Sequence, residues 1–313
     1  MNFIQQAYKG ENNWSYYLGG IFLVIFGWQL IGIMPLAITA ILYSDDLNTF
    51  TNAADSGFMN LGINKNLFLF MMILMFAIGL LFLFMAIKFI HKRAVKTLVT
   101  SRKSIDWSRF WFAFITFGTI AIFIALLGVF LTPENYTWNF KPVPFFTLLA
   151  ISVLFLPLQT SFEELLFRGY FMQGLGTWLK NRWLPLIITS VAFGLLHGAN
   201  PEVEKLGYIS MVFYIGTGFF LGIMTLMDEG TELALGVHAI NNIVAAFLVT
   251  TNWTVFQTDA LFIDTSEPTV GAELFLLVFA IYPLMLFVFS KKYGWKNWKE
   301  KLTGSIQKPQ NIG

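Results

Sequence analysis

The chain has 313 residues, of which 56% are hydrophobic and only 12% are charged, and its mean hydropathy is +0.65. Soluble domains usually carry about 25% charged residues, so this composition predicts a polytopic membrane protein with too little polar sequence for a separate soluble domain. The net charge of +2 gives no indication of a nucleic-acid partner, and the absence of cysteine excludes disulfides, cysteine-ligated metal sites and thiol catalysis.

Uncharged apolar runs recur along the chain, and most reach about 20 residues, the length that a membrane-spanning helix needs. The fifth run is short and the seventh contains polar side chains, so these two are expected to span by context more than by hydropathy. We therefore predict an all-α fold, a bundle of about eight transmembrane helices. The runs are Leu18–Leu42, Leu67–Ile87, Phe110–Leu131, Pro144–Phe162, Trp183–Leu196, Leu206–Met227, Leu233–Thr250 and Leu274–Phe289.

The loop charges predict the orientation in the membrane. Basic residues gather in the loop 91–109 and in the tail after Phe289, whereas the charged residues of the loop 251–273 are all acidic. Under the positive-inside rule, the loop 91–109 and both termini then lie in the cytoplasm. An even number of spans agrees with that arrangement.

The stretch Ser161–Arg168 places two adjacent carboxylates, Glu163 and Glu164, directly after an apolar run. Arg168 follows Glu164 by four residues, so on a helix the two side chains share a face and can pair. Ionisable residues at membrane depth are costly and are functional candidates. The same pattern also suits the charged, interfacial end of a membrane helix, with a local ion pair.

Two of the three histidines lie within or at the edge of apolar runs. His197 follows Phe193 by four residues, and His238 precedes Asn242 by four, so each pair shares a helix face. His91 opens the basic loop and is expected at the surface. Three helices would each present one polar face, and such faces must meet one another or line a wet cavity.

This set of side chains suits amide hydrolysis. A carboxylate such as Glu163 can act as the general base for water, and imidazoles can orient that water. A side-chain amide such as that of Asn242 can donate to the developing oxyanion. Glu163, His197 and His238 could also bind zinc. The HExxH pattern is absent, however, and the two histidines lie 41 residues apart, so the spacing does not favour a metal.

Three motifs occur in order over about 80 residues, namely EExxxR, FxxxH and HxxxN. Together they resemble those of the CAAX-processing and bacteriocin-immunity family of intramembrane proteases, also called the CPBP or Abi family. The resemblance covers roughly residues 145–250. It divides the chain into an N-terminal membrane region (1–140), a catalytic core (141–255), and a last helix with a basic tail (256–313).

The resemblance implies an eight-helix fold whose site lies inside the membrane. It implies that Glu163 is the base, assisted by His197, His238 and Asn242. Glu164 and Arg168 match supporting residues, and Phe193 belongs to the second motif. It implies no cofactor, with zinc as the alternative. The expected partners are membrane lipid and a peptide or lipidated-protein substrate. Because immunity-type members act in bacteria, a bacterial cell membrane is the expected location.

Three functions remain open on the sequence. The first is an intramembrane endopeptidase that acts on a CAAX-type or bacteriocin-related substrate. The second is a non-catalytic immunity or regulatory membrane protein that uses the same fold to bind a partner. The third is an ion-coupled transporter with a Glu and His proton relay, although the chain shows no inverted repeat.

The depth of the site poses a geometric problem. Counted from the cytoplasmic side at about 1.5 Å per residue, His197 would lie about 21 Å beyond Trp183, but His238 only about 8 Å beyond Leu233. The two cannot meet if both helices are straight and start level. Either the fifth helix starts outside the bilayer, or the seventh starts below the membrane surface.

Overall fold

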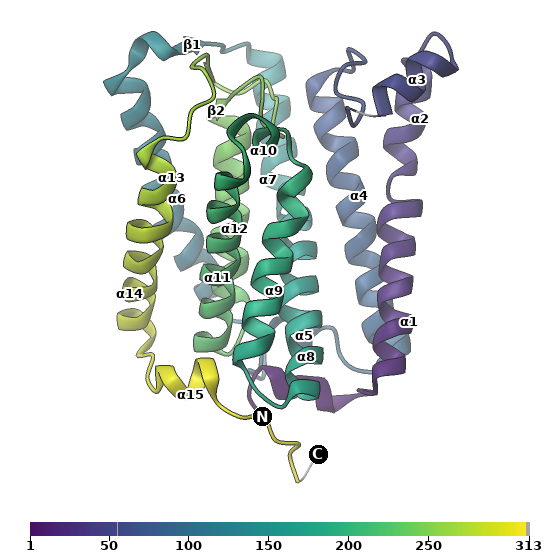
Figure 1. Cartoon of the computed structure of the whole chain (residues 1–313), viewed down its shortest axis with the longest axis vertical. Coiled ribbons are helices and arrows are strands. Elements are labelled where there is room, and N and C mark those ends of the chain that lie inside the picture. Colours follow the sequence, from purple (N-terminus) through teal and green to yellow (C-terminus); the bar gives the residue numbers. More distant parts are fainter. Residues whose placement is uncertain (55, 311–313) are drawn as a thin grey trace.

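The computed structural model describes residues 1–54 and 56–310. It is an all-α bundle whose long helices run roughly parallel to one another (Figure 1). The N-terminus and the last described residues, up to position 310, lie at one end of the bundle, which we call the terminal end (Figure 1). The loop regions that carry β1, β2, α3 and α10 lie at the opposite end, which we call the sheet end (Figure 1).

Eight helical rods make up the bundle, as the apolar runs predict. Within the described residues, six are long and apolar enough to cross a membrane, and α9 and α12 are shorter apolar helices. Several rods contain π-helical segments, namely η2, η3, η5 and η8, whereas the other segments labelled η are short 3₁₀ helices. The rods are α1 (Trp14–Ile25), η2 (Phe26–Ile31) and α2 (Met34–Leu42); α4 (Lys65–Met85) and η3 (Ala86–Ile90); α6 (Trp107–Leu131); α7 (Pro142–Glu164), η5 (Leu165–Phe171) and α8 (Met172–Leu179); α9 (Trp183–Leu196); α11 (Met211–Asp228); α12 (Glu232–Phe247); and α13 (Ala272–Leu276), η8 (Leu277–Ile281) and α14 (Tyr282–Tyr293).

Short elements close the two ends of the bundle. At the sheet end, three short strands, which hydropathy does not predict, form a small sheet of order β1-β3-β2, with β1 antiparallel and β2 parallel to β3. The strands are β1 (Tyr136–Trp138), β2 (Val249–Thr250) and β3 (Phe262–Asp264). The short helices are η1 (Ile4–Lys9), α3 (Leu47–Ala54), α5 (Lys96–Val99), η4 (Pro133–Asn135), η6 (His197–Ala199), α10 (Pro201–Leu206), η7 (Tyr208–Ser210) and α15 (Trp298–Thr303).

The rod that contains α7 carries the two adjacent glutamates. Pro142 lies in its first turn, where the missing N–H costs no helical bond. Pro157 lies inside the helix, and a proline there removes one backbone hydrogen bond. Directly after Glu164 the helix widens into the π-helical segment η5, a feature that is frequent at functional sites.

Helix α12 is the centre of the bundle and packs against α6 and α7, while α11 packs against α9. Glycines permit two of these close approaches. A Cβ atom at Gly218 of α11 would clash with the carbonyl oxygen of Ser190, and one at Gly236 of α12 would clash with that of Phe110. Small residues at such contacts let membrane helices approach closely.

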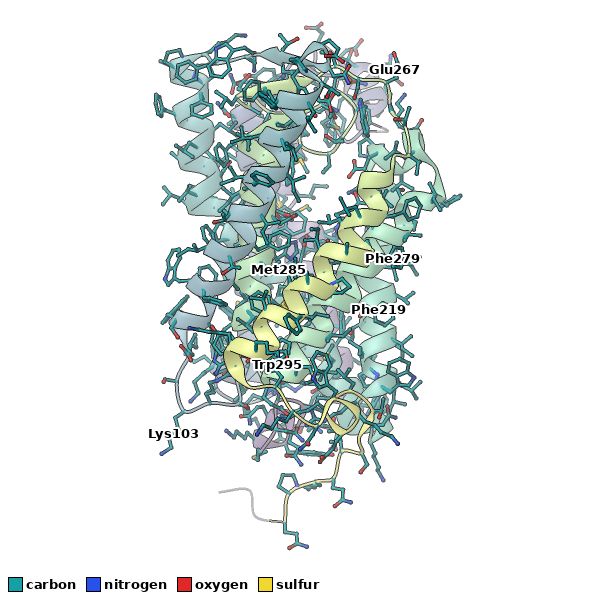
Figure 2. All side chains as sticks on the ribbon, turned by 90° about the vertical axis from the view of Figure 1, so that its left-hand side faces the viewer. Lys103, Phe219, Glu267, Phe279, Met285 and Trp295 are labelled. Atoms are coloured by element: carbon teal, nitrogen blue, oxygen red, sulfur yellow. The ribbon has the colours of Figure 1, made fainter. Side chains whose placement is uncertain are left out.

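The outer surface of the bundle is apolar, as expected for helices that face lipid. Phe130 is 80% exposed and Phe22 is 74% exposed. The rod of η8 and α14 crosses the side of the bundle obliquely (Figure 2), with Met285 of α14 buried and Phe279 of η8 exposed. In water such a surface would be an aggregation liability, but in a bilayer it is the favourable contact.

His91 is fully buried, so the prediction that it lies at the surface is wrong. Its Nδ1 atom lies 2.7 Å from the carbonyl oxygen of Glu11, and its Nε2 atom lies 2.8 Å from the hydroxyl of Tyr170. Burial lowers the pKa of His91 to about 4. The sequence could not indicate this because the partners come from distant segments of the chain.

The first residues of α12 explain how His197 and His238 can lie at the same depth in the membrane. Its first residue, Glu232, is only 1% exposed, whereas Trp183 at the start of α9 is 46% exposed. The loop between α4 and α6 covers the start of α12, since Thr231 donates its backbone N–H to Val99 at 2.7 Å. Helix α12 therefore starts below the surface of the bundle, and His238 reaches the depth of His197.

Candidate active site

A cavity of about 660 Å³ lies in the middle of the bundle. Its walls are mostly apolar, but one side carries a group of polar side chains. Glu163 from α7, His197 from the end of α9, and His238 and Asn242 from α12 all line it. The structure thus brings together the four side chains that the motifs single out.

Glu163 is held at one oxygen and left unpaired at the other. Its Oε1 atom accepts a hydrogen bond of 2.9 Å from the side chain of Gln159, one turn earlier on α7. Its Oε2 atom is buried and has no hydrogen-bond partner among the described residues, although it lies 3.4 Å from Nε2 of His238. A buried oxygen without a partner is costly, so this atom is poised to accept a proton or a hydrogen bond from a molecule in the cavity.

Glu164 points away from the cavity and forms the predicted pair with Arg168. Both side chains are fully buried, and Nη1 of Arg168 lies 2.9 Å from Oε1 of Glu164. The same guanidinium donates to the carbonyl oxygen of Gly218 at 3.0 Å and lies 4.3 Å from the ring centre of Phe193. Arg168 therefore ties α7 to α9 and α11.

His238 connects the two glutamates. Its Nδ1 atom lies 2.8 Å from Oε1 of Glu164, which is paired with Arg168 and accepts the hydrogen bond. Nδ1 therefore carries the proton, and in the neutral ring the lone pair of Nε2 is directed toward Glu163. The ion pair behind the site thus fixes both the tautomer and the orientation of His238.

His197 is oriented in the same way by a different partner. Its Nδ1 atom lies 2.8 Å from the carbonyl oxygen of Phe193, so Nδ1 carries the proton and the Nε2 lone pair is free. Its ring stacks on Tyr214 with the ring centres 4.5 Å apart. The ring of Phe193 contacts both histidines, at 4.8 Å from His197 and 5.9 Å from His238.

Two further sets of residues belong to the site and were not predicted. Gln159 also accepts a hydrogen bond of 3.1 Å from Nδ2 of Asn242, so it bridges α7 and α12. Glu202 accepts a hydrogen bond from the hydroxyl of Tyr214 and another, of 3.0 Å, from the backbone of Val255. Gln159 stands four residues before Glu163 in the sequence, a spacing that could have identified it.

The donor atoms do not form a preorganised metal site. Across the part of the chain that the structure describes, no three histidine, aspartate or glutamate side chains gather closely enough to hold a metal ion. Within the cluster, Nδ1 of His238 and Nδ1 of His197 are engaged, and Nε2 of each ring is the atom left for a metal. Zinc at Glu163, His197 and His238 would require these three side chains to move closer together.

Comparison with known proteins agrees with the motifs. A family model described as type II CAAX prenyl endopeptidase Rce1-like matches residues 142–244, the segment that contains Glu163, His197, His238 and Asn242. The uncharacterized protein YyaK of Bacillus subtilis (strain 168) is 31% identical over 259 residues, which cover 82% of this chain and 85% of that protein. No solved structure was found to match.

Proposed function

Since this chain belongs to the Rce1-like family of type II CAAX prenyl endopeptidases, we propose that it is a glutamate-dependent intramembrane endopeptidase. It hydrolyses a peptide bond of a membrane-associated protein or peptide. The observation that carries this proposal is the buried, unpaired Oε2 atom of Glu163, which faces a cavity between two oriented histidines. Water held there meets a proton acceptor in an otherwise apolar environment.

Hydrolysis begins when Oε2 of Glu163 takes a proton from a water molecule in the cavity. The free Nε2 lone pair of His197 accepts a hydrogen bond from the other O–H of that water and orients it. The resulting hydroxide attacks the carbonyl carbon of the substrate, and a tetrahedral oxyanion forms. One N–H of Asn242 is bound to Gln159, so the second N–H is available to donate to that oxyanion.

The proton then moves from Glu163 to the leaving nitrogen. His238 is placed to relay it, because its Nε2 atom lies 3.4 Å from Oε2 of Glu163. The C–N bond breaks as the nitrogen is protonated, which yields one carboxylic acid and one amine. Glu164 stabilises a transient positive charge on His238, and Arg168 pairs with Glu164 and holds it in place.

The protein is a multi-pass membrane protein, and we place it in a bacterial cell membrane. The basic loop 91–109 and the basic tail support a cytoplasmic location for both termini. The substrate is a lipidated, CAAX-type protein or a bacteriocin-related peptide. The apolar cavity walls suit the side chains of either.

The proposal can be tested before the substrate is identified, because cleavage creates new N- and C-termini in membrane proteins or peptides. Membranes that contain the wild-type protein or the Glu163→Gln variant are compared by mass spectrometry for new N- and C-termini. Glu163→Gln keeps the shape of the side chain and removes the proton acceptor. We expect termini that depend on the wild-type protein. The contrary result is an identical set of termini in both membranes, together with a biological effect that survives Glu163→Gln, His197→Ala and His238→Ala. It would show that the protein acts by binding a partner and not as a protease.

The zinc alternative is decided on the same purified protein. A zinc enzyme carries about one metal ion per chain, and a chelator abolishes its cleavage reversibly. The glutamate mechanism predicts full cleavage by metal-free protein. Cleavage that disappears with the chelator and returns with zinc would contradict it.

A further inference from the structure

Glu202 is a buried acid that the proposed mechanism does not use. It lies in the first turn of α10 and is only 9% exposed. The other buried acids of the described residues, Glu164, Asp228 and Glu232, each pair with an arginine. Within the same part of the chain, no lysine, arginine or histidine forms an ion pair with Glu202. Because glutamate is almost never fully buried unless it is paired, the position of Glu202 points to a role other than an ion pair.

Neutral donors from three segments satisfy both oxygens of Glu202. Its Oε1 atom accepts a hydrogen bond from the hydroxyl of Tyr214 and another, of 3.1 Å, from Nδ2 of Asn200. Its Oε2 atom accepts a hydrogen bond of 3.0 Å from the backbone N–H of Val255. Glu202 therefore ties α10 to the first turn of α11 and to the segment after β2, and it fixes the hydroxyl of Tyr214.

His197 receives little support from its own helix. It follows the last residue of α9 and precedes Gly198, where a Cβ atom would meet nothing within 4 Å. Its Nδ1 atom donates one hydrogen bond, of 2.8 Å, to the carbonyl oxygen of Phe193, and a single bond leaves the ring free to turn about it. The plane of the imidazole is therefore set by its neighbours. Tyr214 lies flat against it, with 19° between the ring planes and 4.5 Å between the ring centres.

We propose that Glu202 and Tyr214 are positioning residues that act together on His197. Glu202 holds the hydroxyl of Tyr214, and the ring of Tyr214 keeps the imidazole in the plane that leaves Nε2 free in the cavity. The arrangement has a counterpart at His238, whose ring is held by Glu164. Its effect on turnover rests on the proposed function, in which Nε2 of His197 orients the water. Its effect on the orientation of the ring does not.

The chain has only three histidines, so each imidazole can be followed by NMR of the full-length protein in detergent, labelled with nitrogen isotope at histidine. The signals of His197 are those lost in His197→Gln. A ring stacked on the imidazole moves its proton signals upfield, and a fixed tautomer keeps its two nitrogen signals apart. We expect Tyr214→Leu to lose the upfield shift and to bring the nitrogen signals together. The signals of His91, which is buried at the terminal end, should not move and thus report that the variant is folded.

Milder variants test the link between Tyr214 and Glu202. Tyr214→Phe keeps the ring and removes its bond to Glu202, and Glu202→Ala removes the same bond from the other side. Both should move the His197 signals in the same direction as Tyr214→Leu, by less. In a Glu202→Ala background, Tyr214→Phe should have no further effect on these signals. Tyr282→Phe is the control, because Tyr282 lines the same cavity but bonds Thr217 and stacks on a different ring.

Turnover is measured on any peptide that the wild-type protein cleaves. Tyr214→Leu should reduce kcat by up to about 100-fold with little change in KM, because a displacement of about 1 Å can cause a loss of that size. Tyr214→Phe should recover part of the loss. Two results would overturn the inference, namely unchanged His197 signals in folded Tyr214→Leu protein, or changed signals with unchanged kcat. A wild-type protein that shows the Tyr214-dependent signals and cleaves no peptide would reject the protease and keep the orientation of His197.

Discussion

Two clusters of acidic and basic side chains are buried in this bundle, and they differ in how their carboxylate oxygens are satisfied. In the terminal-end cluster, each oxygen of Asp228 and Glu232 has a partner. In the site cluster, one oxygen of Glu163 and one of Glu164 have none within the described part of the chain. The site cluster consists of Glu163, Glu164, Arg168 and His238, and the terminal-end cluster of Asp228, Glu232, Arg102 and Arg109.

This difference distinguishes charged side chains that stabilise the fold from charged side chains that can take part in proton transfer. In the terminal-end cluster every carboxylate oxygen has a partner, and none of its residues lines the cavity. These ion pairs fix the start of α12 and contribute rigidity. An unpaired oxygen beside a cavity costs free energy that packing alone would not retain, and it is available for proton transfer. The comparison therefore predicts that changes in the two clusters affect different measured quantities, turnover in one and stability in the other.

Arg168 is the exception within the site cluster, and its loss should have the largest effect on stability. Arg168→Ala leaves Glu164 buried without its cation, which costs about 3–5 kcal/mol of folding free energy. The measurement is thermal unfolding and folded yield in detergent. Arg102→Ala is the matched control and should cost less, because Arg102 is 25% exposed. A well-folded Arg168→Ala protein without activity would instead assign Arg168 a direct role in catalysis.

Gln159 should have an intermediate effect, on turnover. Gln159→Ala removes the hydrogen bond to the carboxylate of Glu163, a loss of about 1.5–3 kcal/mol, or roughly 10- to 100-fold in rate. Initial rates on any substrate that the wild-type protein cleaves measure it. Gln29→Ala is the control, since Gln29 lines the same cavity and makes no hydrogen bond to Glu163. Equal rates for both variants would show that Gln159 does not position the base.

His91 at the terminal end should give the smallest effect, a dependence of stability on pH. Because burial lowers its pKa to about 4 from an ordinary value of 6.5, the unfolded chain binds a proton between these values that the folded protein does not. Its contribution to stability is therefore complete above pH 6.5 and decreases as the pH falls toward 4. The melting temperature of the wild-type protein should fall over this range more steeply than that of His91→Gln. Parallel curves would contradict this assignment.

Hydropathy could predict the eight rods because a membrane helix has to be apolar along its whole length. It could not predict the small sheet, since β2 and β3 contain only two and three residues and show no alternating pattern. Hydropathy also could not predict that α12 starts below the surface of the bundle. That start depends on Arg102, in the loop before α6, and on Arg109, in the first turn of α6, which neutralise Asp228 and Glu232 from a distant part of the sequence.

Motif spacing could identify the polar faces of the site but not all their neighbours. Glu164 and Arg168, Phe193 and His197, and His238 and Asn242 are pairs at helical spacing, so the convergence of the three faces follows from the requirement that polar faces meet inside a bilayer. Tyr214 lies in an apolar run and has the sequence character of a packing residue. Its stacking on His197 depends on the way in which α10 returns the chain to α11, which local sequence does not encode.

The central claim is that Glu163 performs the chemistry, and the most direct test compares Glu163→Gln with Glu232→Gln. Glu163→Gln should reduce turnover by about 10²- to 10⁴-fold with little change in the melting temperature. Glu232→Gln should lower the melting temperature and leave turnover per folded molecule unchanged. Full turnover by folded Glu163→Gln protein would contradict the account.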